Sequence, residues 1–299
     1  MPCTVSGSNG EIGVFIDGRE VEVEDSISLN YATFIENSAR NLPFDFYNGS
    51  AVIYDNEIHI LGGAKNSQSH YKWSGASWRQ VSSIPYYFID GSAVVYNDRI
   101  WLLGSRSGKT DGYTWSPTSG SWSHRTLPYE FFNGCAVVYN NEIHILGGNN
   151  PNINHYKWNG SSWTKVSTLP FAFYDGSAVV FRGEIHILGG GYGDSNTNHY
   201  KWNGSSWAKV STLPYNFKGG SAVVYDNEIH ILGGNDNGTK HYKWNGTSWE
   251  YASSRSYDFH DGSAVVYDNE IHILGGGSTS ESIGKYHKVL GKAYTVEIN

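Results

Sequence analysis

The chain has 299 residues, among them 36 glycines, 11 tryptophans, 22 tyrosines and 12 phenylalanines, and only 16% of its residues are charged. This composition favours a β-rich protein with many turns and excludes a helical bundle, a coiled coil and a disordered chain. The formal charge of −7 argues against general nucleic-acid binding, which needs a basic face. No apolar run is long enough to span a bilayer, so we expect neither nucleic acid nor membrane insertion.

The first 20 residues carry no secretion signal, because they have neither a basic start nor an apolar core. The two cysteines, Cys3 and Cys135, do not form a disulfide framework. We therefore expect a protein of the cytoplasm or of a virion, which assembles inside the cell.

Residues 1–42 lie outside the repeats described below. Ile12–Ile16 and Arg19–Glu24 flank Asp17-Gly18, and this pattern predicts a β-hairpin with a type I′ turn. Residues 28–36 read as a further strand, a candidate for closing a ring or for docking. We divide the chain into this N-terminal segment, through whose hairpin a larger assembly could be joined, and a second unit over residues 43–299.

A segment similar to Gly-Ser-Ala-Val-Val-Tyr occurs six times, at intervals of 42 to 44 residues. Its glycine, here called the repeat glycine, defines units one to six: Gly49, Gly91, Gly134, Gly176, Gly220 and Gly262. This period is typical of the blades of a β-propeller.

Each unit predicts four short strands. In unit four these are Ser177–Phe181, Glu184–Leu188, Tyr200–Trp202 and Trp207–Ser211. Asn203-Gly204 between the last two predicts a type I′ turn, in which both residues have positive φ. The sequence thus predicts an all-β, six-bladed propeller with four antiparallel strands per blade. In unit six, residues 293–298 are the candidate fourth strand, and one terminus is expected to complete that blade.

The repeats resemble the kelch family, whose units have a glycine pair after the second strand and then a Tyr and a Trp separated by six residues. Gly189-Gly190, Tyr200 and Trp207 show this pattern, which implies a kelch-type propeller. Unit two departs from it, since Ser105 replaces the second glycine and its Tyr–Trp spacing is two residues longer. The repeats also resemble those of bacteriophage and gut Firmicutes proteins. The kelch resemblance leaves function open, because the family includes enzymes, adaptors and binding modules.

Histidines recur at one strand position, and we expect them to be structural, because sites that repeat once per blade lie too far apart to share one metal ion. They are His59, His144, His186, His230 and His272. The kelch Trp and Tyr residues are expected to pack between blades. No nucleophile elbow is present, and the cysteine–tyrosine copper site of kelch oxidases does not map onto this chain. We expect no cofactor and no metal.

The best candidate site is formed by the five residues before each repeat glycine, here called the entry loop. Its first and third positions are aromatic in all six units, and we expect them to be buried. We expect the fourth and fifth positions to line a ligand-binding mouth near the axis, where aromatic faces and planar polar groups suit a sugar ring. The candidate residues are Tyr47, Ile89, Phe132, Tyr174, Lys218 and His260 at the fourth position, and Asp90, Asp175 and Asp261, with Asn48 and Asn133, at the fifth. The alternative is that these residues only form turns and cover the channel.

Three functions fit these features. We favour a non-catalytic module that presents its loop face to a glycan or a protein, as in a phage tail or receptor-binding component. The second is an enzyme resembling kelch-type sialic-acid mutarotases, with Glu130, Asp258 and His260 as acid/base candidates. The third is an intracellular kelch adaptor.

Overall fold

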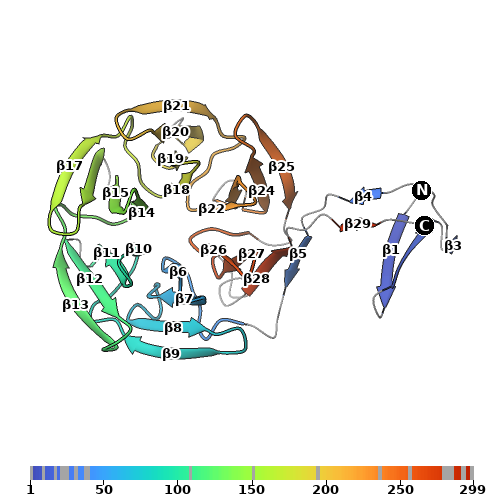
Figure 1. Ribbon diagram of the computed structural model, residues 1–299, viewed down its shortest axis with the longest axis horizontal. Coiled ribbons are helices and arrows are strands. Elements are labelled where there is room, and N and C mark those ends of the chain that lie inside the picture. The colour runs from blue at the N-terminus through green and yellow to red at the C-terminus, as the bar shows by residue number, and fades with distance from the viewer. Residues whose placement is uncertain are drawn as a thin grey trace.

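The computed structural model describes residues 41–107, 110–149, 152–192, 196–234, 238–254 and 258–277, together with the backbone of strands near both ends. The described strands form a ring of antiparallel sheets, with the strands nearest the two ends of the chain to one side of the ring (Figure 1). No helix in the described part of the chain is long and apolar enough to cross a membrane.

Five of the sheets are four-stranded blades built from consecutive strands. The first is β6 (Ser50–Tyr54), β7 (Glu57–Leu61), β8 (Ser69–Trp73) and β9 (Trp78–Ser83). The second is β10 (Ser92–Val95), β11 (Ile100–Leu103), β12 (Asp111–Ser116) and β13 (Ser121–Thr126). The third is β14 (Cys135–Tyr139), β15 (Glu142–Leu146), β16 (Asn154–Trp158) and β17 (Trp163–Thr168). The fourth is β18 (Ser177–Phe181), β19 (Glu184–Leu188), β20 (Asn198–Trp202) and β21 (Trp207–Thr212). The fifth is β22 (Ser221–Tyr225), β23 (Glu228–Leu232), β24 (Lys240–Trp244) and β25 (Trp249–Ser254). The fold is an all-β propeller with four-stranded antiparallel blades.

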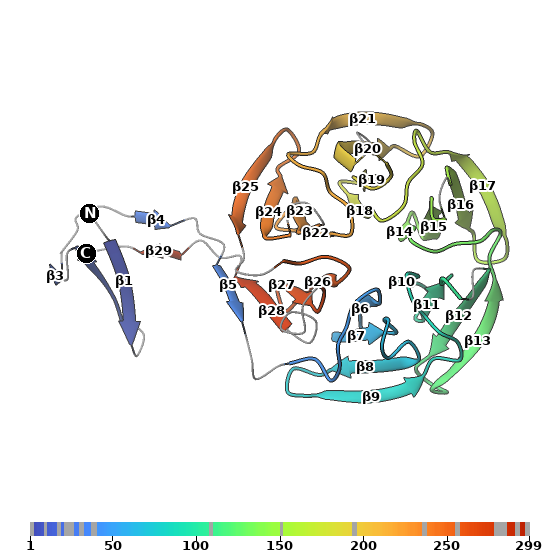
Figure 2. The same ribbon diagram turned by 180° about the vertical axis from the view of Figure 1, so that it is seen from behind.

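The last sheet of the ring joins the two ends of the chain. It comprises β26 (Ser263–Tyr267), β27 (Glu270–Leu274), β28 (Tyr286–Leu290) and, as its outermost strand, β5 (Thr33–Glu36). Figure 2 shows β5 beside β28 from behind. The expectation that one terminus completes this blade is confirmed, because β5 lies within the candidate ring-closing strand over residues 28–36. The other candidate, residues 293–298, does not supply the strand, because β29 (Tyr294–Val296) pairs with β4 (Ile27–Leu29) in a separate two-stranded sheet.

A small three-stranded sheet lies beyond this pair (Figure 1). The expected hairpin is part of it, as β2 (Glu11–Ile16) and β3 (Arg19–Glu20) are antiparallel, and β1 (Cys3–Ser8) adds a strand that the sequence analysis did not anticipate. The turn residues Asp17-Gly18 lie outside the described residues.

The hydrophobic core lies between neighbouring blades. Between the fourth and fifth, for example, Phe181 and Leu188 pack in one cluster with Ile229 and Ile231. The kelch tryptophans join these interfaces, because the Trp207 indole N–H of the fourth blade donates to Ser167 Oγ of the third at 3.1 Å. This confirms that the repeated aromatics connect blades.

The repeated histidines form hydrogen-bonded chains inside the blades. In the first blade His59 Nδ1 lies 2.7 Å from His70 Nε2, and His70 Nδ1 lies 3.0 Å from Ser82 Oγ. Ser82 Oγ also accepts the indole N–H of Trp122 from the second blade at 3.1 Å. Burial lowers the pKa of His59 to about 4 and that of His70 to about 3, because both rings are removed from water. The structural interpretation of these histidines is therefore confirmed.

The turns at the face of the propeller opposite the entry loops are of two kinds. The first turn of each blade has the type I′ backbone, as in Asp226-Asn227 with φ of 49° and 57°. At Asn203-Gly204 the type I′ prediction is wrong, because only Gly204 has a positive φ, of 99°. The side chain of Asn203 explains the difference, since its Oδ1 accepts the backbone N–H groups of Ser205 and Ser206.

Candidate ligand-binding face

The entry loops meet in a closed ring of backbone hydrogen bonds around the axis, here called the axial ring. The fifth-position N–H of each unit donates to the fifth-position carbonyl of the unit before it. The six contacts are Asn48 to Asp261 (2.6 Å), Asp90 to Asn48 (2.8 Å), Asn133 to Asp90, Asp175 to Asn133, Gly219 to Asp175 and Asp261 to Gly219 (2.7 Å each).

The axial ring explains which residues occupy the fifth position. All six have a left-handed backbone, with φ between 54° for Asp175 and 70° for Gly219. Asn, Asp and Gly tolerate this conformation better than other residues. The turn-forming interpretation is therefore correct for the backbone, whereas the side chains remain available for other contacts.

The third position anchors each loop. Its six phenylalanines, Phe46, Phe88, Phe131, Phe173, Phe217 and Phe259, are fully buried. The Phe173 ring lies so close to Gly176 that a Cβ there would be 2.4 Å from Cε2, which explains why the repeat residue is glycine. The expected burial of Phe46, Phe131, Phe173 and Phe259 is confirmed. At the first position only Tyr215 is buried among the described residues, and the expectation is wrong for the half-buried Phe44, Tyr86, Tyr129 and Phe171.

Carboxylates alternate around the axial ring, in units two, four and six, and each one is paired with a cationic or titratable group. Asp90 Oδ2 lies 2.6 Å from Arg106 Nη2, and Asp175 Oδ2 lies 3.4 Å from Lys218 Nζ. Asp261 Oδ2 lies 3.0 Å from His260 Nδ1. The mouth therefore carries three pairs rather than a concentrated negative charge.

Burial raises the pKa of two of these carboxyls. The pKa of Asp90 is about 6, because desolvation and the negative charges of Asp175 and Asp261 outweigh the attraction of Arg106. The pKa of Asp175 is also raised, mainly by burial, although Lys218 opposes the shift. Among the described residues, no group of three or more His, Cys, Asp or Glu is arranged to hold a metal ion.

The fourth-position side chains differ in exposure. Tyr47, Ile89, Phe132, Lys218 and His260 are half-buried, as a partly open mouth requires. Tyr174 is only 5% exposed, so the expectation that it is solvent-accessible is wrong. The reason is Tyr192, whose ring lies edge-on to that of Tyr174 at 5.1 Å between centroids.

The comparisons with known proteins agree with this architecture. No protein-family model matches the sequence, and no curated protein matches it. Among solved structures, one titled "Structure of YjhT" superposes with a TM-score of 0.71 at 14% sequence identity, covering 83% of this chain and 94% of that one. The chain folds as a kelch-like β-propeller. At this identity the similarity concerns the fold alone.

Two residues of the propeller mouth were not found from the sequence. Arg106 and Tyr192 both follow a strand-ending glycine, in loops that differ from unit to unit. Tyr192 is 68% exposed, and Lys218 Nζ lies 4.8 Å from the Tyr174 ring centroid and 5.9 Å from that of Tyr192. The sequence does contain an indication of Arg106, because this cation directly follows Ser105, the residue that replaces the second glycine of unit two.

The three acid/base candidates of the propeller are not gathered together by any direct contact among the described residues. Glu130 and Asp258 are exposed, and Glu130 Oε2 accepts Asn149 Nδ2 at 3.2 Å. Of the three, His260 has the clearest link to the axial ring, through Asp261. Asp90 is a better acid/base candidate by position and by pKa.

Proposed function

We propose that this chain is a non-catalytic binding module, a six-bladed kelch-type propeller whose loop face binds a glycan or a protein. Its sixth blade is the sheet that β5 completes. The observation that supports this most is the closed axial ring of backbone hydrogen bonds, which holds three paired carboxylates next to exposed or half-buried aromatic rings.

The chemistry of the mouth suits a sugar better than a metal or a nucleic acid. Tyr192 offers an exposed aromatic face, and Lys218 and Arg106 offer donors beside carboxylate acceptors. A sugar stacks its C–H face on an aromatic ring and needs donors and acceptors for its hydroxyls. In a phage-tail or receptor-binding setting, the N-terminal sheet would attach the propeller to a larger assembly.

A glycan array with the purified chain tests this proposal. We expect binding that is lost in Tyr192→Ala and Arg106→Ala but retained in Tyr251→Ala, which removes an exposed aromatic ring from the outer strand β25. No glycan or protein binding on arrays of either kind, or equal loss in all three variants, would refute the loop face as the site.

A sialic-acid mutarotase-like activity is the alternative, and the Asp90 carboxyl favours it. A group with pKa of about 6 on the axis is suited to proton transfer near neutral pH. The anomer exchange of N-acetylneuraminate, followed by NMR, tests the alternative. Catalysis that Asp90→Asn abolishes would support the enzyme; no acceleration over buffer would leave the binding module.

A further inference from the structure

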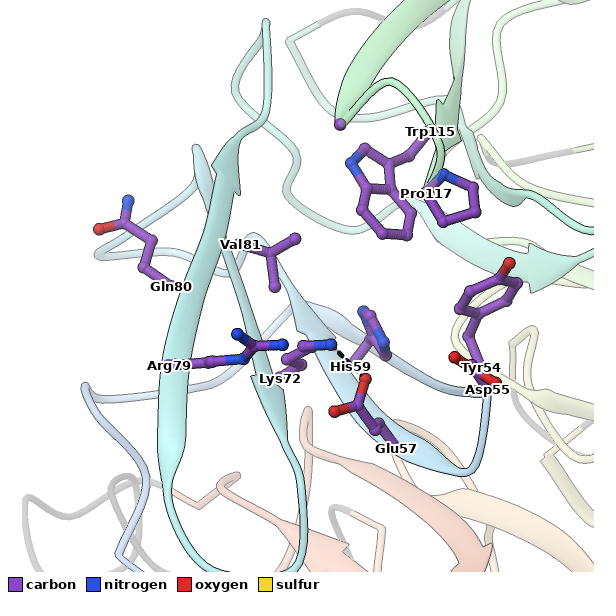
Figure 3. Close-up of a pocket in the computed structure, with 11 residues that line it drawn as sticks. Tyr54, Asp55, Glu57, His59, Lys72, Arg79, Gln80, Val81, Trp115 and Pro117 are labelled. Carbon is purple, nitrogen blue, oxygen red and sulfur yellow. Dashed lines mark hydrogen bonds and ion pairs between the residues drawn. The ribbon is translucent and has the colours of Figure 1, made fainter.

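A pocket of about 410 Å³ lies at the seam between the first two blades, here called the seam pocket (Figure 3). Tyr54, at the end of β6 opposite the entry loop, lines it together with His59 of β7, Lys72 of β8 and Arg79 of β9. Trp115 and Pro117 of the second blade form the facing wall. The seam pocket is therefore separate from the axial mouth, and its volume is within the range of small-molecule sites.

Two buried nitrogen atoms of the seam pocket have no hydrogen-bond partner among the described residues. They are Nε1 of Trp115, a residue 5% exposed, and Nε2 of His59, a residue 1% exposed. The two rings are neighbours, with centroids 5.8 Å apart, and Figure 3 shows the Trp115 indole nitrogen on the side of its ring toward Val81. An unpaired buried donor costs free energy, so an acceptor, either a water or a ligand atom, is expected beside each of these nitrogens. Unpaired nitrogens also occur at His144, His186, His230 and Trp163, so the pocket itself and the charge described below distinguish this seam, rather than the unpaired atoms alone.

The hydrogen-bond chain identifies His59 Nε2 as a second donor. Ser82 Oγ accepts the Trp122 indole N–H, and the acceptor available to its own hydrogen among the described contacts is His70 Nδ1. Neutral His70 then carries its proton on Nε2 and donates to His59 Nδ1, which leaves the proton of neutral His59 on Nε2. At the same strand position His272 Nε2 faces the carbonyl oxygen of Tyr267 at 2.8 Å, a contact in which the histidine must donate.

The departures of unit two from the repeat explain why this seam differs from the others. In regular units a hairpin glycine closes the seam, as at Gly204, where a Cβ would lie 3.4 Å from Tyr139 Oη of the preceding blade. In unit two the β12–β13 ladder continues one pair beyond Trp115 and Trp122, to Ser116 and Ser121, and Tyr54 Oη donates to Asp98 Oδ1 at 2.9 Å.

The seam pocket also differs in charge from the equivalent place in the other blades, because it has Arg79. Arg79 lies across from Lys72 in the β8–β9 ladder, where the third, fourth and fifth blades have Thr164, Ala208 and Glu250. Lys72 is paired with Glu57, whereas among the described residues no carboxylate lies within ion-pair distance of Arg79. Arg79 is therefore the cation that remains for a ligand, and Asp55 and Glu57 are the anions that line the same pocket.

We propose that the seam pocket binds a small carboxylate ligand, whose oxygens accept from Trp115 Nε1 and His59 Nε2 and whose apolar body lies against Trp115, Pro117 and Tyr54. Arg79 supplies the charge that favours a carboxylate over a neutral carbonyl, since charge-assisted hydrogen bonds are about twice as strong as neutral ones. The carboxylate belongs to a free molecule or to the C-terminus of a peptide, and the experiment below separates these sources.

Benzoate and benzamide provide matched probes in a titration of the ¹⁵N-labelled full chain followed by NMR. The Trp115 indole N–H signal is assigned by its loss in Trp115→Phe, or by its shift in His59→Gln should that variant not fold. We expect benzoate to move this signal downfield with a dissociation constant in the millimolar range, as is usual for a ligand of this size. We expect benzamide to bind about tenfold more weakly.

A second titration compares the peptide Gly-Gly-Phe with its C-terminal amide. Tighter binding of Gly-Gly-Phe than of benzoate would identify a peptide C-terminus as the source of the carboxylate.

Arg79→Thr, which installs the residue found at position 164, should weaken benzoate about tenfold. Thr164→Arg is the matched control at the equivalent place in the third blade and should leave the Trp115 titration unchanged. An unmoved Trp115 signal with both carboxylates, equal binding of benzoate and benzamide, or undiminished binding in Arg79→Thr would each overturn the proposal.

Discussion

The amide of Asn48 donates a 2.6 Å hydrogen bond to the carbonyl oxygen of Asp261, which joins the first repeat to the last at the axis. A second contact in the same place joins Gly276 N to Phe46 O at 2.9 Å. On the outside of the ring, β5 pairs with β28. Closure therefore involves backbone contacts at both the inner and the outer edge of the last sheet.

The outer closure can be tested by removing one strand from its ladder. Phe34 and Ile35 lie opposite Val289 and Lys288 in the β5–β28 pair. Neighbouring N–H groups of an edge strand point alternately toward the partner strand and away from it, so proline at one of these two positions removes a ladder donor. We expect the more disruptive of Phe34→Pro and Ile35→Pro to lower the free energy of unfolding of the ring by about 1–3 kcal/mol, the cost of an unpaired acceptor, measured by urea unfolding. Val14→Pro, in the three-stranded sheet outside the ring, is the control and should leave that unfolding transition unchanged.

The axial ring should tolerate glycine but not alanine at its fifth positions. Asn133 has φ of 57°, and alanine in a left-handed conformation costs about 1–2 kcal/mol. We expect Asn133→Ala to be destabilised by this amount in urea unfolding and Asn133→Gly to be close to the parent, because Gly219 occupies the same place in unit five. Equal stability of the two variants would contradict a requirement for positive φ.

The sequence predicted the repeating parts of this fold and missed the parts that do not repeat. The spacing of the repeat glycines and the aromatic third positions identified the blades and the buried Phe173, because these features follow from packing that recurs in every unit. Tyr192 lies in a loop of unequal sequence that no repeat pattern marked, and Arg106 was marked only indirectly, by the loss of the second glycine at Ser105. The pairing of β5 rather than β29 with β28 depends on where two distant segments meet, which periodicity cannot determine.

Acid should destabilise the propeller through its buried histidines. The pKa of seven of them is lowered from 6.5 to about 3 or 4, mainly by burial: His59, His70, His144, His155, His186, His199 and His230. Between pH 6.5 and 4 the unfolded chain binds more protons than the folded one, so their contribution to stability is complete above pH 6.5 and is lost as the pH falls.

The expected slope is up to about 1.4 kcal/mol per pH unit for each histidine. Asp90, whose pKa is raised to about 6, and Asp175, whose pKa is also raised, oppose this trend, but they are fewer than the histidines. Thermal unfolding between pH 7 and pH 4.5 measures the effect, and His144→Gln/His155→Gln should make the curve shallower. A melting temperature that stays constant over this range would show that the histidines are not buried neutral.

Trp207 should contribute to stability through its ring and through its indole N–H. The half-buried ring packs beside Trp202 at 5.5 Å, and the N–H reaches Ser167 of the neighbouring blade. We expect Trp207→Ala to cost about 3 kcal/mol, the lower end for a large aromatic residue because this one is not fully buried. Trp207→Phe should cost about 1 kcal/mol, since it mainly loses the hydrogen bond. Urea unfolding measures both, and equal costs would show that the ring itself contributes little.

The loop-face proposal makes its sharpest prediction at Phe132 and Tyr192. Tyr192 is exposed, so replacing it with alanine should cost under about 0.5 kcal/mol. Phe132 is half-buried, and replacing it with alanine should cost about 1–2 kcal/mol. Tyr174 is unsuitable for this test, because it is buried beneath Tyr192 and its loss would disturb the cation–π contact with Lys218. We expect Phe132→Ala/Tyr192→Ala to lose binding to the best glycan or protein found on an array, while it keeps a cooperative thermal unfolding transition. Tyr251→Ala removes an exposed ring from the outer strand β25 and should bind normally. If the double variant binds as well as Tyr251→Ala does, the ligand contacts another face of the propeller, and the axial ring serves only to close it.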